Sequence, residues 1–471
     1  MNTRLLLYKA AVARDANERT NERTMSNDVG TGVSVQKCLP WCCCCCIVIG
    51  AVALLAGVLT ASSLRCFPVT ALAVVNVNTS VGLDGGALTM TCAAEYVSLG
   101  VPAGDGMVEV YRLNFANVTY ASSQTLTPPN ASEAGMFGAA VSADCRSGVL
   151  AVGEPTYDSS RGRAHVYNRS SDITDVASNY ALLATLENPE AADASLFGRA
   201  LSFACQRRVL AVGAPMYAGG DGRVYVYAFD ADANDFVLTD TLDAPSPANV
   251  TAASQFGSDV ALSCDALVLV VGAPKDADDG SALVYDRPNT TEPFVLTSRH
   301  DASEAGQTTS YFGASVATAK RGAVIVIGAP RHDSANETLE DGGLVRVLSR
   351  ANATAPYMLL SPDLDGAVEG ARFGASVSVS GDGRYLVVGS SSPSEPGSLS
   401  RFVFNNAQPY AYNPDTSALA DYNGSALLGA AVATSFAGKE YGSVSASNGA
   451  NSTQIGVLAC SNRQGTACPA C

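Results

Sequence analysis

The chain has 471 residues, of which 47% are hydrophobic and 15% are charged, and it contains 43 glycines. This composition argues against a disordered or coiled-coil chain and favours a large β-rich globular region. The net charge of −15 and the scarcity of lysine argue against a nucleic-acid partner, because binding to phosphates requires clustered cations.

The N-terminal region differs in composition from the rest. Residues 1–37 are polar and of mixed charge, which predicts a disordered tail. Residues 38–64 carry no charge and are long enough to cross a bilayer as a single helix. Positive residues precede this run, so the tail is expected in the cytosol and the rest of the chain outside it. These features predict a single-pass type II membrane protein of the cell surface or secretory pathway.

A cleaved signal peptide is the alternative. The aliphatic part, 47–59, has the length of a signal-peptide core, although a 37-residue leader is too long unless Met25 is the true start. Cleavage near residue 63 would give a secreted protein. Cysteines at the border of the apolar run are candidates for palmitoylation, or are simply small apolar residues of the helix: Cys38, Cys42, Cys43, Cys44, Cys45 and Cys46.

N-glycosylation sequons follow the apolar run, and none precedes it. They are at Asn78, Asn117, Asn130, Asn168, Asn249, Asn289, Asn336, Asn352, Asn423 and Asn451. Eight cysteines also follow the run, an even number that suits disulfides in an oxidising compartment: Cys66, Cys92, Cys145, Cys205, Cys264, Cys460, Cys468 and Cys471.

A repeated sequence motif extends over residues 65–460. A Phe-Gly pair recurs at intervals of 60, 59, 56 and 61 residues, beginning at Phe137, Phe197, Phe256, Phe312 and Phe373. Two weaker copies flank these five: one begins at Leu428, and the other places Asp84 at the Phe position. The repeats therefore number seven, and residues 461–471 remain as a cysteine-containing tail.

Each repeat contains the pattern of four strands. A short apolar segment such as "ASVATA" precedes a β-branched run such as "VIVIGAP", and an aromatic strand such as "GRVYVYAF" precedes a more polar one such as "DFVLTDTLDAP". Four antiparallel strands repeated radially form a propeller blade. The fold class expected is all-β, a seven-bladed β-propeller preceded by a single N-terminal transmembrane helix.

The two ends of the repeat region are expected to meet. The last copy offers strands near 428–435, 441–446 and 453–459 but no fourth strand. The segment 68–77, "PVTALAVVNV", precedes the first copy and has the composition of a strand. It is predicted to supply the outer strand of the last blade and so to close the ring.

The "FG", "GAP" and "GxVYVY" segments resemble the FG-GAP repeats of the integrin α-subunit N-terminal propeller over about residues 68–460. The resemblance implies a cell-surface propeller for adhesion or recognition. It also implies that ligand approaches the loops joining strand two to three and strand four to the next blade. The chain has no inserted domain, leg domains or C-terminal membrane helix, so it is not expected to be an integrin subunit.

The metal sites of that family are not expected here. Its calcium loops, of the DxDxDGxxD type, lie between strands one and two, but the corresponding turns here ("CAAEY", "CRSGV", "CQRRV", "CDALV", "KRGAV", "GDGRY", "AGKEY") have too few carboxylates for calcium. Asp276, Asp278 and Asp279 lie in a different loop and read as a solvated acidic turn. We therefore expect no metal, no cofactor and folding that is independent of calcium.

Catalytic signals are poor. The three histidines, His165, His300 and His332, belong to no recognised catalytic motif, and His165 lies within a strand pattern. A carboxylate pair assembled from separate blades, as in a glycosidase, could not be read from spacing. We expect no catalytic residues and no enzyme, with a propeller enzyme as the least favoured reading.

The loops between strands two and three (155–163, 215–223, 274–281 and 330–343) supply the candidate ligand-binding residues. These are Tyr157, Arg161, Tyr217, Asp221, Asp276, Arg331 and His332 on one face, and Tyr and Arg are favoured at interfaces. Ordinary solvated loop residues are the alternative. The two functions left open are recognition of a protein or glycan ligand and a passive surface scaffold or coat protein.

Four cysteines occupy one place, the end of strand one, in four successive repeats: Cys92, Cys145, Cys205 and Cys264. Neighbouring blades place such positions side by side, so bridges between blades are feasible where the Cα atoms come within about 7 Å. Four small buried thiols are the alternative.

Overall fold

The computed structural model describes the residues that form the repeat region. They are 74–77, 86–91, 95–114, 119–130, 135–144, 148–169, 179–190, 194–205, 208–245, 253–277, 279–302, 310–333, 339–391, 397–405, 411–414, 431–434, 440–446 and 453–459. All of them belong to one compact unit, 67–468.

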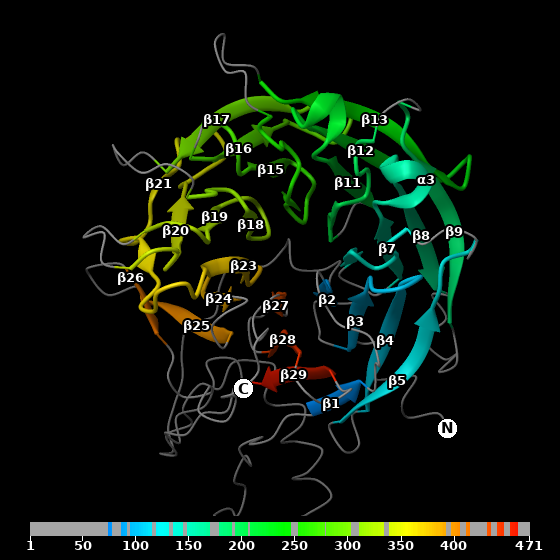
Figure 1. Ribbon diagram of the computed structural model, residues 1–471. Coiled ribbons are helices and arrows are strands. Elements are labelled where there is room, and N and C mark those ends of the chain that lie inside the picture. Colours follow the sequence, from blue (N-terminus) through cyan, green and yellow to red (C-terminus); the bar gives the residue numbers. More distant parts are fainter. Residues whose placement is uncertain are drawn as a thin grey trace, which may run out of the picture. The chain divides into compact units, whose positions relative to one another are not determined.

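Six sheets are each built from one continuous stretch of chain, and we number them blade 1 to blade 6 (Figure 1). Blades 1 and 2 contain β2 (Leu88–Met90), β3 (Tyr96–Val101), β4 (Met107–Asn114) and β5 (Thr119–Leu126), then β6 (Ala140–Ala143), β7 (Val149–Glu154), β8 (Arg163–Arg169) and β9 (Tyr180–Glu187). Blades 3 and 4 contain β10 (Ala200–Phe203), β11 (Val209–Ala214), β12 (Arg223–Asp230) and β13 (Asp235–Asp243), then β14 (Val260–Leu262), β15 (Val268–Ala273), β16 (Ser281–Asp286) and β17 (Val295–Asp301). Blades 5 and 6 contain β18 (Ser315–Thr318), β19 (Val324–Ala329), β20 (Leu344–Ser349), β21 (Met358–Leu359) and β22 (Leu364–Asp365), then β23 (Phe373–Val379), β24 (Tyr385–Ser390), β25 (Ser398–Asn405) and β26 (Ala411–Pro414).

A further four-stranded sheet, the closing sheet, joins both ends of the repeat region. Its order is β1 (Val74–Val77), β29 (Thr453–Ala459), β28 (Glu440–Ala446) and β27 (Val432–Thr434). β1 pairs antiparallel with β29, with Val74 opposite Gly456 and Val77 opposite Thr453. β27 contacts both β2 and β23, so this sheet lies between blade 1 and blade 6. The all-β propeller and the predicted pairing of the early strand with the last repeat are confirmed.

Two glycines explain why "FG" and "GAP" recur together. Gly213, in the "GAP" of blade 3, packs against Gly257, in the "FG" of blade 4, where φ is +87°. A Cβ on Gly213 would lie 2.1 Å from the Gly257 carbonyl oxygen, so any side chain there forces the blades apart. The same contact recurs at the other joints: Gly100 with Gly138, Gly153 with Gly198, Gly272 with Gly313, and Gly328 with Gly374.

The apolar core lies between blades. Phe256 is fully buried and belongs to one cluster with Val224 and Val226 of blade 3 and with Leu269 and Val271 of blade 4. Equivalent clusters join blades 1 and 2, blades 2 and 3, blades 4 and 5, and blades 5 and 6. Each blade therefore covers one face of its neighbour's sheet, as propeller packing requires.

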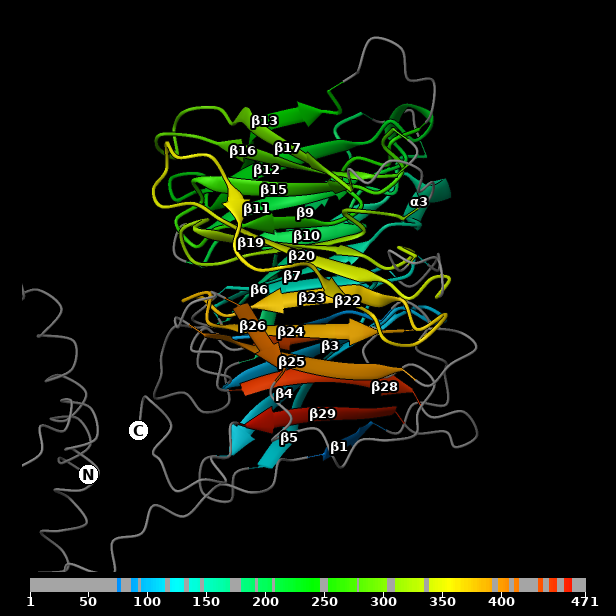
Figure 2. The ribbon, with the colours of Figure 1, turned by 90° about the vertical axis from the view of Figure 1, so that its left-hand side faces the viewer.

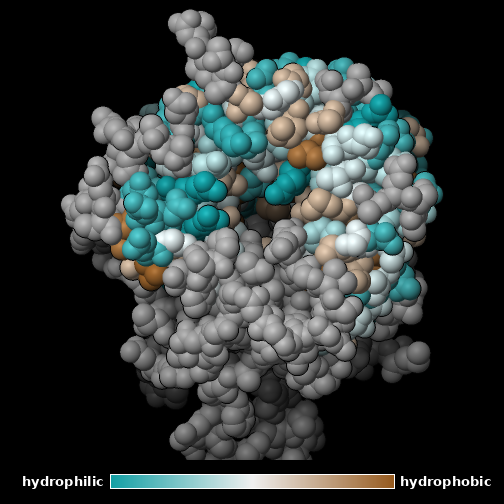
Figure 3. Space-filling view, viewed as in Figure 1, coloured by the Kyte–Doolittle hydropathy of each residue, from teal (hydrophilic) through white to brown (hydrophobic). Residues whose placement is uncertain are grey.

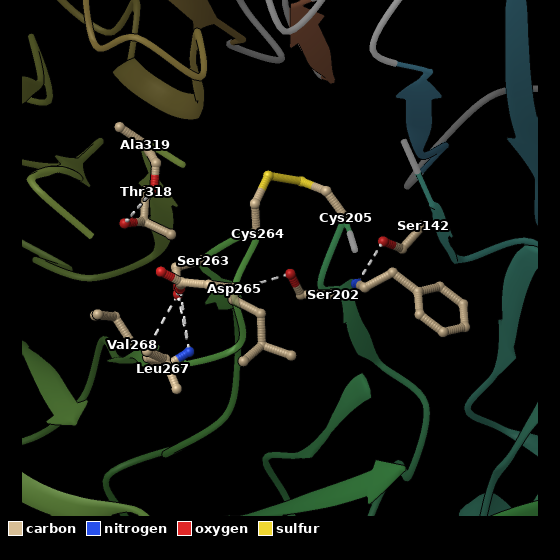
Figure 4. Close-up of a disulfide and its surroundings, with 12 residues drawn as sticks. Ser142, Ser202, Cys205, Ser263, Cys264, Asp265, Leu267, Val268, Thr318 and Ala319 are labelled. Carbon is tan, nitrogen blue, oxygen red and sulfur yellow. Dashed lines mark hydrogen bonds between the residues drawn. A yellow bond between two sulfur atoms is a disulfide. The ribbon is translucent and has the colours of Figure 1, made fainter. Parts of the chain in front are cut away.

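A disulfide bridges blades 3 and 4 between Cys205 and Cys264, whose Cα atoms are 4.3 Å apart (Figure 4). Beside it the Ser202 hydroxyl accepts a hydrogen bond of 2.9 Å from the Leu262 N–H. The Ser142 hydroxyl makes the same bond to the Phe203 N–H at the preceding joint. The predicted bridging is confirmed for this pair, while Cys92 and Cys145 lie outside the described residues.

No helix in the described part of the chain is long and apolar enough to cross a membrane. The predicted tail 1–37, the predicted span 38–64 with its six border cysteines, and the tail 461–471 lie outside the described residues. Their assignments stay predictions.

Candidate functional site

The connections from strand two to strand three lie together on one face of the ring, which we call the loop face. It faces the viewer in Figures 1 and 3, and Figure 2 shows it edge-on, on the side of α3 (Tyr157–Ser160). Its described surface is largely hydrophilic and is hollowed at the centre (Figure 3). The candidate ligand-binding residues come from these connections, so the expectation of a shared face agrees with the fold.

Four of the candidates occupy one structural position in successive blades, the third residue after the end of strand two. They are Tyr157, Tyr217, Asp276 and His332, and we call this the anchor position. In each case the carbonyl oxygen accepts a hydrogen bond of 2.8–3.1 Å from the N–H of the glycine that immediately precedes strand three: Gly162, Gly222, Gly280 and Gly343. The backbone of the anchor position is thus fixed in the same way four times.

Serines tie three of these connections to the next blade. The Ser195 hydroxyl of blade 3 donates to the Arg161 carbonyl of blade 2 at 3.2 Å. The Ser254 and Ser310 hydroxyls donate in the same way to the carbonyls of Asp221 and Asp279, at 2.6 Å and 2.7 Å. A loop face held by such bonds presents its side chains from a rigid frame, which suits recognition.

In blades 2 and 3 an arginine stacks on the tyrosine of the anchor position. The Arg163 guanidinium lies 3.4 Å from the centre of the Tyr157 ring, and that of Arg223 lies 3.9 Å from the Tyr217 ring. Cation–π contact of this kind orders both partners. The half-buried tyrosines are therefore partly used within the fold, whereas Asp221 is exposed and the Arg161 side chain is 40% exposed.

In blades 4 and 5 the anchor residues turn inward. Asp276 is 4% exposed, and its Oδ2 accepts 2.6 Å and 3.0 Å contacts from the Ser281 hydroxyl and the Arg299 guanidinium. His332 is also 4% exposed. The picture of a solvated acidic turn is therefore wrong for Asp276, and Asp278 lies outside the described residues. The neighbouring Arg331 is exposed, with its guanidinium 4.6 Å from the Tyr311 ring centre.

Sequence reasoning missed a buried polar cluster in blade 2. Glu154 replaces the alanine of "GAP", and its Oε2 accepts hydrogen bonds from Arg163 Nε at 2.6 Å and from His165 Nε2 at 2.8 Å. All three side chains are at most 4% exposed. Burial alone would raise the pKa of Glu154, but the bonds from His165 and Arg163 outweigh it and hold that pKa below its usual value. The only signal in the sequence was "GEP" in place of "GAP".

This cluster is closed to substrate, because the His165 side chain is 1% exposed and its Nδ1 faces the Thr185 hydroxyl at 3.1 Å. His165 therefore packs as a structural residue, as its strand pattern predicted. Within the described ranges no group of three or more His, Cys, Asp or Glu side chains is arranged to hold a metal ion.

The described sequon asparagines are distributed over both faces. Asn130 is exposed on the chain leading from blade 1 to blade 2, and Asn289 and Asn352 are exposed in the turns between strands three and four of blades 4 and 5. Asn168 is partly buried near the end of β8. The remaining six sequon asparagines lie outside the described residues.

Comparison with protein families and with curated sequences gives no match. Among solved structures, the fold is similar to Sqt1 from Chaetomium thermophilum bound to the N-terminus of the ribosomal protein L10, at 17% identity over 78% of this chain and 83% of that one, with a TM-score of 0.48. It is also similar to hydrazine synthase from Kuenenia stuttgartiensis, at 12% identity over 82% of this chain and 97% of that one, with a TM-score of 0.49. These likenesses carry nothing about ligand or activity.

Proposed function

We propose that the chain is a membrane-anchored, glycosylated recognition protein whose β-propeller binds a protein or glycan ligand on its loop face. The observation that carries the proposal is the repeated frame of that face. Four successive connections are fixed by the same backbone bonds, and three of them are tied to the next blade by a serine. Rigid scaffolds that present variable loops are the usual basis of recognition sites.

Arg161, Asp221 and Arg331 are the side chains that we expect to contact ligand. Each comes from a different blade and reaches solvent. Arg161 is presented together with its ion-pair partner Asp158, Asp221 supplies a carboxylate and Arg331 supplies a guanidinium. Arginine is enriched among residues that dominate binding energy. The stacked Tyr157 and Tyr217 add apolar surface beside them. The buried Asp276 and His332 would shape the loops without touching ligand.

The membrane anchor and the extracytosolic location follow from the charge bias around 38–64 and from the one-sided sequons. The resemblance of "FG", "GAP" and "GxVYVY" to integrin α repeats supports a role in adhesion. In this proposal the propeller is the recognition head, presented by the predicted N-terminal helix.

A passive surface scaffold is the second candidate, and one observation favours it. Two anchor residues are stacked by arginines and two are buried, so all four serve the fold itself. A scaffold without a discrete ligand would need nothing more from this face.

Reversing charge on the loop face separates the two candidates. The full chain is expressed on the surface of cells that lack it, either unchanged or with Arg161→Glu and Arg331→Glu combined. Adhesion to neighbouring cells and binding to a glycan array are then measured. We expect the double variant to lose binding at least tenfold, while Arg321→Glu, at an exposed position in the strand one-to-two turn of the opposite face, binds normally. Absence of binding by the unchanged protein would support the scaffold, and equal binding by all three proteins would contradict the assignment of the ligand site to Arg161 and Arg331.

The location is tested separately by antibody staining of the propeller on intact and permeabilised cells. Staining of intact cells is expected. In sealed microsomes, protease should remove only the N-terminal tail. Cleavage of the propeller from the cytosolic side would contradict the proposed topology.

A further inference from the structure

Exposed apolar side chains line the outer circumference of the ring. They lie on the outermost strands of four successive blades, β9, β13, β17 and β21, which Figure 1 shows along the outer edge. We call them the apolar rim: Leu182, Val237, Leu238, Val295, Leu296, Met358 and Leu359, which are 39–65% exposed. Apolar surface gathered in this way marks an interaction site more often than apolar residues scattered singly.

The rim residues share one register. Leu238 lies opposite Tyr227 of the neighbouring strand, Leu296 opposite Tyr285, and Leu359 opposite Leu348. These pairings place them at the same level, close to the turn that leads into the outer strand. The rim is therefore one feature repeated around the ring.

In blades 4 and 5 a sequon occupies that turn. Asn289 precedes Val295 by six residues, and Asn352 precedes Met358 by the same interval. Both asparagines are exposed. Val295, Met358 and Leu359 are also the most exposed residues of the rim, at 59%, 65% and 54%. In blade 3, where the turn 231–234 has no sequon, Val237 and Leu238 are 40% and 42% exposed, close to the 39% of Leu296 in blade 4. The contrast therefore rests on Val295, Met358 and Leu359.

Both sequons adopt the same local conformation. The Asn289 Oδ1 accepts hydrogen bonds from the Thr291 N–H at 2.9 Å and from its hydroxyl at 2.6 Å. The Asn352 Oδ1 accepts the equivalent bonds from Thr354, at 3.0 Å and 2.9 Å. These bonds use the side-chain oxygen, whereas a glycan is attached to the amide nitrogen. The turns thus hold each asparagine at the surface in a defined orientation.

We propose that N-linked glycans on Asn289 and Asn352 lie against the apolar rim and cover Val295, Leu296, Met358 and Leu359. The inference rests on the proposed function, since it requires an extracytosolic propeller. Transfer from a lipid diphosphate-linked oligosaccharide forms the bond from sugar C1 to the Asn nitrogen, breaks the bond from C1 to phosphate, and releases an amide proton. The C–H faces of the sugar rings then pack on apolar side chains, while their hydroxyls face water and keep the surface soluble.

The test uses the full chain made in a eukaryotic secretory host, with glycan occupancy at each sequon read by mass spectrometry. Binding of an apolar dye and the fraction of aggregated protein are compared for wild type and for Asn289→Gln with Asn352→Gln. We expect the double variant to bind at least threefold more dye and to aggregate more. Thr290→Ala, which changes the turn but keeps the sequon, is the matched control and should behave as wild type.

Two further measurements separate shielding from misfolding. Native wild-type protein treated with an amidase that removes whole N-glycans should gain dye binding without any substitution. Adding Val295→Ser and Met358→Ser to the double variant should return dye binding close to the wild-type level.

The outcomes distinguish this inference from the proposed function. Glycans present at Asn289 and Asn352 whose removal leaves dye binding unchanged would overturn the shielding alone. Occupancy at Asn130 with Asn289 and Asn352 bare would do the same. Absence of glycan from every sequon would overturn both the shielding and the extracytosolic location.

Discussion

Two joints of the ring are held in different ways. Blades 3 and 4 are linked by the Cys205–Cys264 disulfide and by the bond from the Leu262 N–H to Ser202. The closing sheet instead depends on the pairing of β1 with β29, between residues more than 370 positions apart. Among the described residues neighbouring repeats are thus joined covalently at one place, whereas the two ends of the repeat region meet through the backbone pairing of β1 with β29. We therefore expect the closing sheet to separate from its neighbours before the other joints when the protein unfolds.

Removing the closing strand is expected to have the largest effect. Deletion of 68–77 takes away β1 and leaves β29 as an open edge, and open edges promote aggregation. We expect the variant to aggregate and to melt well below the wild type, as followed by light scattering and circular dichroism during heating. A variant that stays monomeric and keeps its melting temperature would show that β1 does not close the ring.

Breaking the disulfide should cost less. Cys205→Ser with Cys264→Ser opens a loop of 59 residues, and loss of such a cross-link destabilises a protein by about 2–4 kcal/mol. The unfolding free energy in urea should fall by this amount, and a reductant should lower the wild type to the level of the variant. An unchanged variant would mean that the joint does not open in the unfolding transition.

The joint between blades 4 and 5 should respond to pH. The Asp259 carboxylate accepts a 2.8 Å bond from the Val316 N–H of blade 5, and burial raises the pKa of Asp259 to about 6 despite the lowering effect of bonds from Val316 and Val260. The folded state therefore favours the protonated acid, and this stabilisation, complete only below the ordinary Asp pKa of about 4, is lost as pH rises from there through about 6.

Asp259→Ala removes this pH dependence. The difference in unfolding free energy between wild type and variant should shrink by about 2–3 kcal/mol from pH 4 to pH 7.5. Urea titrations at several pH values measure it. A difference that stays constant, or grows with pH, would contradict the raised pKa.

Calcium should have the smallest effect, namely none. The turns between strands one and two carry too few carboxylates to bind it. Because a ligand that binds only the folded state raises the melting temperature, the glycosylated protein should melt alike in EDTA and in millimolar calcium. A reproducible rise of several degrees would reveal a site, with the loop around Asp276 and Asp279 as the first region to mutate.

The repeat pattern made the architecture accessible from sequence, because each blade needs the same glycines at its joints. Gly213 and Gly257 illustrate this, since no other residue fits their contact. Closure was also predictable, because the last repeat lacks a fourth strand and the early strand 68–77 belongs to no other repeat.

The loop face was harder to predict. Tyr157, Tyr217, Asp276 and His332 align in sequence, but whether a loop side chain points outward depends on neighbours that the alignment does not show. Asp276 turns inward because Arg299, from the outer strand of the same blade, reaches it. The blade 2 cluster was missed for the same reason, since Glu154 meets His165 only across paired strands.

That cluster bears on how the chain finds the correct order of its blades. Similar repeats can dock on the wrong neighbour during folding, and tandem arrays are prone to such misassembly. In blade 2 the buried carboxylate of Glu154 requires both Arg163 and His165, whereas the corresponding residues of blade 4 are Ala273, Ser281 and Leu283. A segment exchanged between these blades would bury the Glu154 carboxylate without the hydrogen bonds from Arg163 and His165, at a cost of several kcal/mol. Glu154 thus distinguishes blade 2 from the other repeats and favours the correct order of blades when the ring assembles.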